Sequence, residues 1–362
     1  MIFSLYFNQN TFKCEGFPLY FQQLLLLIIH QFQGERSSTA PYYLLKGKKS
    51  GQTIQDVTYF NLHPYFCLYP KLAKETYDDE IVKLLTQNFI VMNESTISIT
   101  EKGLHQIVSS RRPYYNGYKL RGKEFVFWGR MELIVQTLSQ FQENEKKFVP
   151  VQKSNEIHQF VKEFLHQRDF QSSSFGTNFK HQLSDLLENP HLLEIHRNLF
   201  VYRLSGYKNS GLTWEQLATR YHMTVLDVKL LFIECLHILL NEITEEKYPD
   251  FHALTKNIYV QNPLTDSALK SSKLFEKGYS IEAIARIRFL KENTIEDHVI
   301  EIVSVDPNFP IQSFISDEQV QKVLQIAQER QTKKLKIIRE GVPDLSYFQI
   351  RLALTKGEEV NG

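Results

Sequence analysis

The chain has 362 residues, a length that predicts about two or three domains. Hydrophobic residues make up 42% and charged residues 23%, an ordinary globular composition that excludes disorder throughout the chain. The net charge of +1 argues against a protein coated with positive charge for bulk nucleic-acid binding, although a local basic patch stays compatible with it. Glycine is scarce, with 15 residues, which disfavours folds built on glycine-rich phosphate loops.

Cysteine usage and apolar runs indicate a cytoplasmic protein without a membrane segment. Cys14, Cys67 and Cys235 are scattered, and no CxxC or Cys/His cluster exists, so neither a zinc site nor a disulfide framework is expected. The longest apolar run is 24–29, which is too short to span a bilayer. No basic segment precedes an apolar stretch at the start, so a signal peptide is not expected.

The first part of the chain predicts helices. Apolar residues are dense over 17–32, which indicates a buried helix that Gly34 ends. Thr53 is expected to cap a helix that begins at Ile54. A further helix is expected to open at Asp78 and Asp79.

A β-hairpin is predicted next. The strands are 89–92 and 96–100, and the polar pair Asn93 and Glu94 separates them. A short helix is expected after 101–103. The order of helix, hairpin and following helix resembles the end of a winged-helix domain, in which the hairpin is the wing.

From residue 124 onward the pattern is helical. A stripe of apolar residues at three- and four-residue steps predicts one long helix over 124–142. The expected fold class is therefore mainly α, with an N-terminal winged-helix-like domain that carries a small hairpin, a helical middle and a C-terminal helix-turn-helix domain. Polar and proline-containing breaks predict these domains at 1–150, 151–255 and 256–362.

Two segments share the spacing of a helix-turn-helix. This motif needs a small residue where the two helices cross, an apolar plug in the turn and an apolar residue that faces back from the second helix. In each set the plug follows the small residue by five positions, and the inward-facing residue follows the plug by five. The C-terminal set is Ala285, Leu290 and Ile295, and the earlier set is Ala218, Met223 and Val228. The alternative interpretation is that both are plain helical hairpins that serve as scaffold.

The second helix of the C-terminal copy is poorly suited to reading DNA. Its sequence over 292–301 contains four acids and no Lys or Arg. Phosphates would repel such a helix from the major groove, where Arg, Lys, Asn and Gln read bases. The helix near 225–229 is mixed and very apolar. Protein contact is therefore favoured over DNA reading for both copies.

The C-terminal third resembles a known family. The runs 273–285, 293–298, 335–340 and 345–353 resemble the helicase helix-turn-helix domain, which occurs at the C-termini of some RecQ-type helicases. The whole chain resembles the stand-alone YpbB-type proteins, which are encoded beside a RecQ-type helicase. This resemblance implies support of DNA repair or recombination and no reaction. Here Ile287 and Phe289 flank Arg288 where the family is more polar.

The resemblance and the acidic second helix together predict a docking surface for a RecQ-family helicase. Phe289 is the expected apolar anchor. The charges expected to face a basic patch of the partner are Glu292, Glu296, Asp297 and Glu301.

Enzymatic motifs are absent from the sequence. Residues 46–53 imitate a phosphate loop, but Gly51 is followed by Gln52 instead of Lys, and a basic loop is the better interpretation. His191 and His196 are five residues apart, which places them on different helix faces and makes a metal pair improbable. No enzymatic activity, cofactor or metal is expected.

One segment suits weak, non-specific contact with DNA, particularly single strands. Cations that follow phosphates and rings that stack on bases are interleaved there. The predicted nucleic-acid-binding residues are Arg111, Arg112, Tyr114, Tyr115, Lys119, Arg121 and Lys123. The alternative is a solvated linker whose tyrosines pack on the protein.

The sequence thus favours a non-enzymatic accessory factor of a RecQ-family helicase in DNA repair or recombination. The alternative is a DNA-binding helix-turn-helix transcription regulator, which would need a basic reading helix that neither copy has. A third and much weaker hypothesis is that the chain is an enzyme of unrecognised type. The sequence predicts no oligomeric state.

Overall fold

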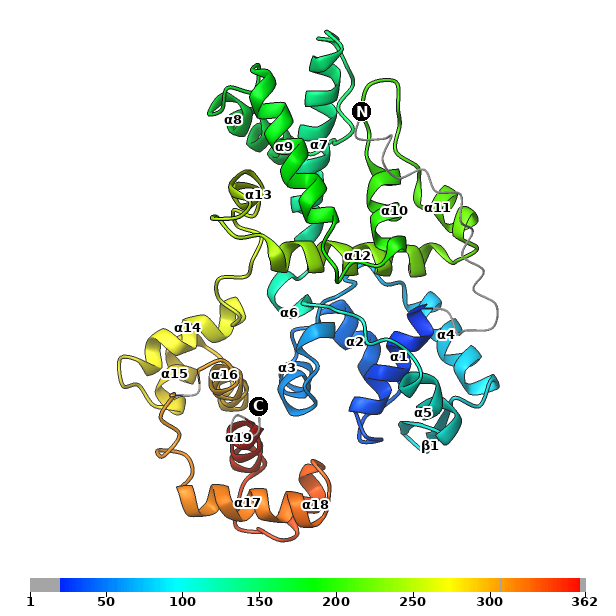
Figure 1. Ribbon diagram of the computed structural model, residues 1–362. Helices are drawn as coiled ribbons and strands as arrows, with labels where there is room; N and C mark the ends of the chain where they lie inside the picture. The colour runs from blue at the N-terminus through cyan, green and yellow to red at the C-terminus, as the bar shows by residue number, and fades with distance from the viewer. Residues whose placement is uncertain (1–19, 307, 359–362) are drawn as a thin grey trace. The chain divides into compact units, whose positions relative to one another are not determined.

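The computed structural model describes residues 20–306 and 308–358. The fold is mainly α, as predicted, and the strands in these residues form one two-stranded hairpin (Figure 1). The described residues pack as two compact units, each built from separate stretches of sequence. Unit 1 contains 20–24, 110–116 and 120–260, and unit 2 contains 25–109, 117–119 and 261 onward. The predicted domains 1–150, 151–255 and 256–362 are proposed as segments that each fold independently, and this stays a prediction.

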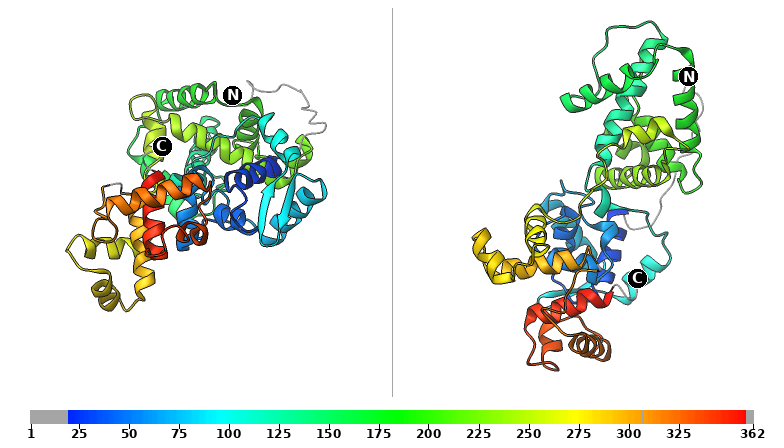
Figure 2. Two further views of the ribbon diagram at one scale, coloured as in Figure 1. Left: turned by 90° about the horizontal axis from the view of Figure 1, so that it is seen from below. Right: turned by 90° about the vertical axis from the view of Figure 1, so that its left-hand side faces the viewer.

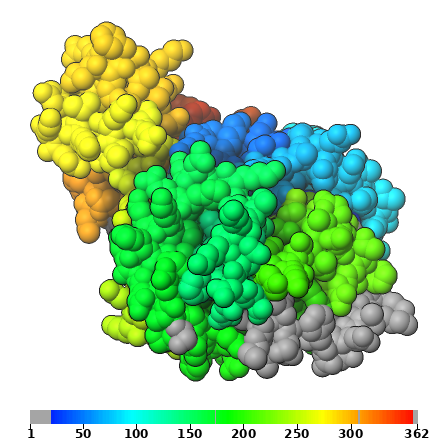
Figure 3. All heavy atoms as spheres, turned by 90° about the horizontal axis from the view of Figure 1, so that it is seen from above, coloured from blue at the N-terminus to red at the C-terminus, as the bar shows by residue number. Residues whose placement is uncertain are grey.

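Unit 1 is a helical assembly around one buried helix, α12. The helices are α7 (Glu124–Gln142), α8 (Asn155–His166), α9 (Ser173–Leu187), α10 (Glu194–Arg203), α11 (Trp214–Tyr221), α12 (Val225–Glu242) and α13 (Pro249–Leu254). Every side chain from 230 to 240 is buried. α12 packs against α7, α9, α10 and α11. On the side seen in Figure 3, the residues of unit 1 coloured from teal to green lie side by side.

The long helix predicted over 124–142 is confirmed as α7 with the same bounds. Its buried stripe includes Phe127, Met131 and Ile134. Trp128 meets Phe200 of α10 and Phe232 of α12 edge to face, with ring centroids 5.0 and 4.8 Å apart. These contacts join three helices at the centre of unit 1.

The N-terminal part of unit 2 carries the predicted hairpin. Its elements are α1 (Tyr20–Gln31, from Leu25 onward), α2 (Ala40–Lys46), α3 (Gly51–Tyr59), the 3-10 helix η2 (His63–Tyr65), α4 (Lys74–Thr86), β1 (Ile90–Asn93), β2 (Thr96–Ile99), α5 (Glu101–Val108) and α6 (Gly117–Leu120). The strands are antiparallel, and Ile90 pairs with Ile99. Gly103 is required in α5, because a Cβ atom there would lie 2.2 Å from the carbonyl oxygen of Phe89.

The C-terminal part of unit 2 is entirely helical. It contains α14 (Asp266–Phe275), α15 (Ile281–Arg288), α16 (Glu292–Val303), α17 (Asp317–Glu329), α18 (Leu335–Arg339) and α19 (Tyr347–Glu358). α14, α15 and α16 pack together as a three-helix unit, and α17 lies beside α19 (Figure 2). α16 also packs against α3 and α19, so the two sequence-distant parts of unit 2 share one core.

Several predicted helix starts need correction. Ser50, and not Thr53, caps α3, because the Ser50 side chain accepts the Thr53 N–H and the helix begins at Gly51. α4 begins at Lys74, four residues before Asp78, without a side-chain cap. α5 begins at Glu101, directly after its cap Thr100. The buried first helix is confirmed from Tyr20, whereas Cys14 and 17–19 lie outside the described residues.

Two features of the described residues bear on membrane and metal binding. None of the helices in 20–306 and 308–358 is long and apolar enough to cross a membrane. Over the same ranges, no three His, Cys, Asp or Glu side chains gather as metal ligands.

A polar cluster joins α14, α15 and α16 of unit 2. Arg288, the last residue of α15, donates to the carbonyl oxygen of Ser267 at 2.7 Å and to the Ser271 hydroxyl at 2.5 Å. The Ser271 hydroxyl lies 2.9 Å from Nδ1 of His298 in α16. Burial, together with the Arg288 charge, lowers the pKa of His298 to about 4.

We expect the stability of the chain to fall as pH decreases from about 6.5 to 4 through His298. The folded state prefers neutral His298, whereas the unfolded state binds a proton below about 6.5, so acid favours unfolding by at most about 3 kcal/mol. Thermal unfolding of the wild type and of His298→Asn between these pH values measures the difference. If both proteins lose the same stability over this range, His298 does not carry the effect.

Candidate functional site

The C-terminal helix-turn-helix has the geometry that the sequence predicts. Ala285 is buried where α15 crosses α16, and Ile295 of α16 is buried against it. The turn closes through a hydrogen bond of 3.0 Å from the Leu290 N–H to the Ala285 carbonyl oxygen. Leu290 packs on the small core of Ile284, Ala285 and Ile295, which confirms its role as the plug.

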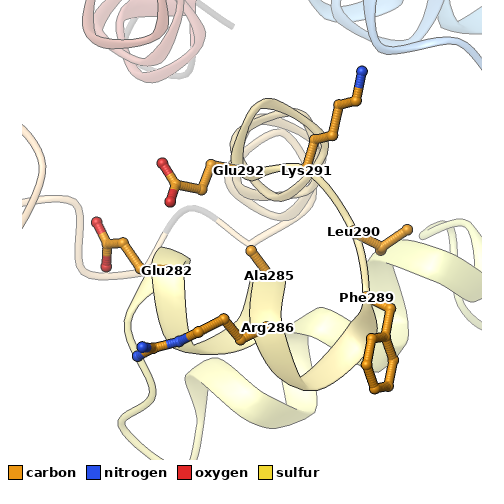
Figure 4. Close-up of a pocket in the computed structure, with 7 residues that line it drawn as sticks. All are labelled: Glu282, Ala285, Arg286, Phe289, Leu290, Lys291 and Glu292. Carbon is orange, nitrogen blue, oxygen red and sulfur yellow. The ribbon is translucent and has the colours of Figure 1, made fainter.

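Phe289 occupies an unusual position at the start of this turn. It ends α15 in the left-handed region, with φ 54° and ψ 42°. Bulky side chains rarely adopt this conformation, which glycine and asparagine adopt at lower cost. Its side chain is nevertheless 95% exposed, the highest value among the exposed large hydrophobic residues. Figure 4 shows the ring projecting from the turn, away from the carboxylates of Glu282 and Glu292.

The copy in unit 1 repeats this turn in detail. Its end residue His222 has φ 52°, and the Met223 N–H donates to the Ala218 carbonyl oxygen at 3.0 Å. Val228 is buried in α12, as predicted. Two helix-turn-helix turns with the same offsets are therefore confirmed, but the exposed residue at the left-handed position is the polar His222 in one and the apolar Phe289 in the other.

Neither second helix is presented to solvent as a reading helix. α12 is the buried centre of unit 1. α16 is held by Arg351 of α19, whose Nη1 lies 2.7 Å from Oδ1 of Asp297 and whose Nε donates to Gln55 of α3 at 2.9 Å. The hydroxyl of Tyr59 in α3 donates to the carbonyl oxygen of Arg351 at 2.7 Å. The face of α16 that turns away from α15 is thus occupied by the rest of unit 2.

Two comparisons with known proteins show which family this chain belongs to. The helix-turn-helix domain family matches residues 267–354, which run from α14 into α19. "Protein YpbB" of Bacillus subtilis is 32% identical to the chain over 348 residues, which cover 93% of this chain and 97% of the relative. The chain belongs to the YpbB family. The resemblance seen in the sequence is thereby confirmed, and no solved structure matches the chain.

The acidic residues predicted to face a partner are placed very differently in this YpbB-family chain. Glu292 is exposed at the start of α16. Asp297 is held by Arg351. Glu301 is buried and accepts the backbone N–H and the hydroxyl of Thr265, the cap of α14. Glu296 is half-buried, and burial raises its pKa. Of the four acids, Glu292 is the most exposed, Asp297 is partly exposed but paired, and Glu301 is buried.

A shallow groove of mixed charge adjoins Phe289. Its lining residues are Glu282, Ala285, Arg286, Phe289, Leu290, Lys291 and Glu292 (Figure 4). Ile287 and Tyr279 are also exposed on α15 and just before it, at 48% and 44%. The structure therefore brings an exposed aromatic ring, nearby apolar surface and charges of both signs together at the turn. Arg286 and Lys291 add positive charge to the surface of Phe289 and acidic residues that we expected.

The predicted nucleic-acid residues Arg111, Tyr114 and Tyr115 lie against α12. Nη2 of Arg111 donates to Glu234 at 2.8 Å, and the Tyr114 N–H donates to the same carboxylate at 2.8 Å. Tyr115 is buried, and its hydroxyl donates to the Leu230 carbonyl oxygen at 3.2 Å. In this arrangement Tyr115 offers no ring face to a base, and the guanidinium of Arg111 already has a carboxylate partner.

The other four predicted nucleic-acid residues have different surroundings. Arg112 is exposed, and Arg121 is half-buried. Lys123 donates to the Asn257 carbonyl oxygen at 3.2 Å. Lys119 belongs to unit 2, whereas the other six residues belong to unit 1. Whether any of the seven contacts DNA stays a prediction.

Sequence reasoning missed the residue that organises this segment, Glu234 of α12. It is fully buried and also accepts the hydroxyl of Tyr20, while Nε2 of His196 lies 3.3 Å away. Burial would raise the pKa of Glu234, but His196 and Arg111 outweigh it and lower this pKa to about 2. One signal was available: an acid inside the apolar run 230–240 requires a buried partner.

Proposed function

We propose that this chain is a non-enzymatic accessory factor that docks on a RecQ-family DNA helicase through the turn of its C-terminal helix-turn-helix. The observation that carries the proposal is Phe289, a fully projecting aromatic ring in a conformation that glycine or asparagine would adopt at lower cost. Folding alone gives no reason for a phenylalanine there. A partner pocket that buries the ring does, because aromatic anchors of this kind dominate protein interfaces.

The packing of α16 supports docking over DNA reading. A helix that reads the major groove must insert its outer face between the phosphate backbones. Here α3 and α19 cover that face, and Asp297 is fastened to Arg351. A sequence-specific regulator would have to separate these helices, so the regulator function is the weaker alternative.

The identity of the partner rests on resemblance. Residues 273–298 and 335–353 are similar to a domain that is fused to RecQ-type helicases, and membership of the YpbB family fits a stand-alone version of it. We propose that the complex acts in the cytoplasm in DNA repair or recombination, with the helicase supplying all ATP-driven chemistry.

Calorimetric titration of the purified full-length chain with the RecQ-family helicase of the same organism tests this function. We expect saturable binding with a dissociation constant of about 1 μM or tighter. In parallel, fluorescence anisotropy measures binding to duplex DNA of varied sequence. Tight, sequence-specific duplex binding without binding to the helicase would replace the accessory function with the regulator function.

A further inference from the structure

A basic surface in the N-terminal part of unit 2 is not used by the docking function. Between residues 40 and 74 the chain has five lysines and a single acid, Asp56, whereas α4 continues after Lys74 with Glu75, Asp78, Asp79 and Glu80. Asp56 is buried, and Arg36 binds its Oδ1 through Nη2 at 2.7 Å. The lysines of this stretch are Lys46, Lys48, Lys49, Lys71 and Lys74. We call this set the α2–α4 lysine face.

Two tyrosines of α2 hold three of these ammonium groups in place. Nζ of Lys46 and Nζ of Lys74 lie 5.6 and 5.5 Å from the ring centroid of Tyr42. Nζ of Lys48 lies 3.9 Å from the centroid of Tyr43, and the two rings are 5.6 Å apart. Cation–π contacts restrict the long side chains, so less entropy is lost when the ammonium groups bind an anion.

Backbone pairing brings a fourth lysine to the same face. The loop after η2 runs along the end of α2, where the Cys67 and Tyr69 N–H groups donate to the Leu44 and Leu45 carbonyl oxygens, each at 2.9 Å. Nζ of Lys46 donates to the carbonyl oxygen of Leu72 at 3.4 Å, next to Lys71. This loop therefore places the exposed Lys71 beside the end of α2.

Most of these cations have no acidic partner. Lys48, Lys49 and Lys71 are exposed, and within 20–306 and 308–358 no carboxylate forms an ion pair with them. Lys74 is paired with Asp78 on the surface. Arg111, by contrast, forms an ion pair with the buried Glu234. The lysine face is thus the better placed of the two basic clusters to bind an external anion.

We propose that the α2–α4 lysine face binds the phosphodiester backbone of DNA without reading its bases. Lysines act as point charges for phosphate, and the tyrosine faces that could stack on bases are already covered by ammonium groups. A membrane surface is disfavoured, because within residues 20–86 a single large apolar side chain, Val82 of α4, is exposed to insert among lipids. This proposal adds DNA contact to the proposed docking function, and it does not depend on that function.

Fluorescence anisotropy of the full-length chain with labelled single strands and duplexes of unrelated sequence tests the proposal. The variant combines Lys48→Gln, Lys49→Gln and Lys71→Gln. Its matched control combines Lys146→Gln, Lys147→Gln and Lys153→Gln, three exposed lysines of unit 1, and changes the net charge equally. We expect the variant to bind at least about tenfold more weakly at low salt, with the log–log salt slope for duplex smaller by about 2 to 3, while the control binds like the wild type.

Three results would overturn the proposal: absence of DNA binding by the wild type at low salt, an unchanged salt slope in the variant, or an equal loss in variant and control. Binding of the wild type to vesicles with anionic lipid, but not to DNA, would assign the face to a membrane instead. Substitution of exposed lysines costs little stability, and a thermal melt of each variant checks this. Helicase affinity is expected to be the same in the variant, so failure here is separate from failure of the docking function.

Discussion

Replacing Arg111 with alanine is expected to lower the free energy of unfolding by about 3 kcal/mol. Glu234 has no access to water and is ionised, and Arg111 supplies its positive partner at 2.7 Å. Removing one member of a buried ion pair costs about 3–5 kcal/mol because the other charge stays buried without compensation. The lower end applies here, since 40% of the Arg111 side chain is exposed and the Tyr20 hydroxyl still binds Glu234. Urea unfolding at neutral pH measures the loss.

Arg112→Ala is the matched control for this prediction. Arg112 is the next residue and is exposed, and its side chain is not part of the Glu234 cluster. Its removal should change stability by less than about 0.5 kcal/mol. If Arg111→Ala is as stable as Arg112→Ala and instead loses DNA affinity, then Arg111 acts as a nucleic-acid ligand and the structural role assigned to it is wrong.

Replacing Phe289 with alanine is expected to weaken helicase binding by about 1–3 kcal/mol, or roughly 5- to 150-fold in the dissociation constant. The ring is the largest projecting apolar group at the turn, and its burial in a partner pocket would make it the main single contributor to the affinity. Stability should not fall, because the ring makes no contact with the C-terminal core of Ile284, Ala285 and Ile295. Calorimetry and a thermal melt of the same sample measure both quantities.

Val149→Ala provides the control for Phe289. Val149 is an apolar side chain of unit 1 that is 86% exposed, so its truncation also removes exposed apolar surface. Helicase affinity should be unchanged in this variant. Equal losses from both substitutions would indicate non-specific hydrophobic association and would remove the reason for assigning the interface to the turn.

Local signals account for the parts of the fold that the sequence predicts. The helix over 124–142 follows from its apolar period, and the hairpin follows from two short apolar strands around a polar turn. Both helix-turn-helix turns follow from residues that lie within ten positions of Ala218 and Ala285. Each of these features depends on neighbours in sequence, and so a single chain suffices to recognise it.

The parts of the site that the sequence could not predict depend on distant residues. Arg111 meets a carboxylate 123 positions away, and Asp297 meets an arginine of α19. A count of charges cannot separate a cation or acid that is free to bind a partner from one that is already paired inside the fold. For the same reason, the lysine face emerged only when folding brought Lys46 and Lys74 onto the ring of Tyr42.

Photo-crosslinking from the turn tests the docking function most directly. The full-length chain with Phe289→p-benzoylphenylalanine is irradiated with the purified helicase and duplex DNA together, and Val149→p-benzoylphenylalanine serves as the control. Because the ring at 289 projects into solvent from a surface that we assign to the partner, we predict a crosslink to the helicase from position 289 and none from position 149. A crosslink from position 289 to DNA, with none to the helicase, would contradict the account.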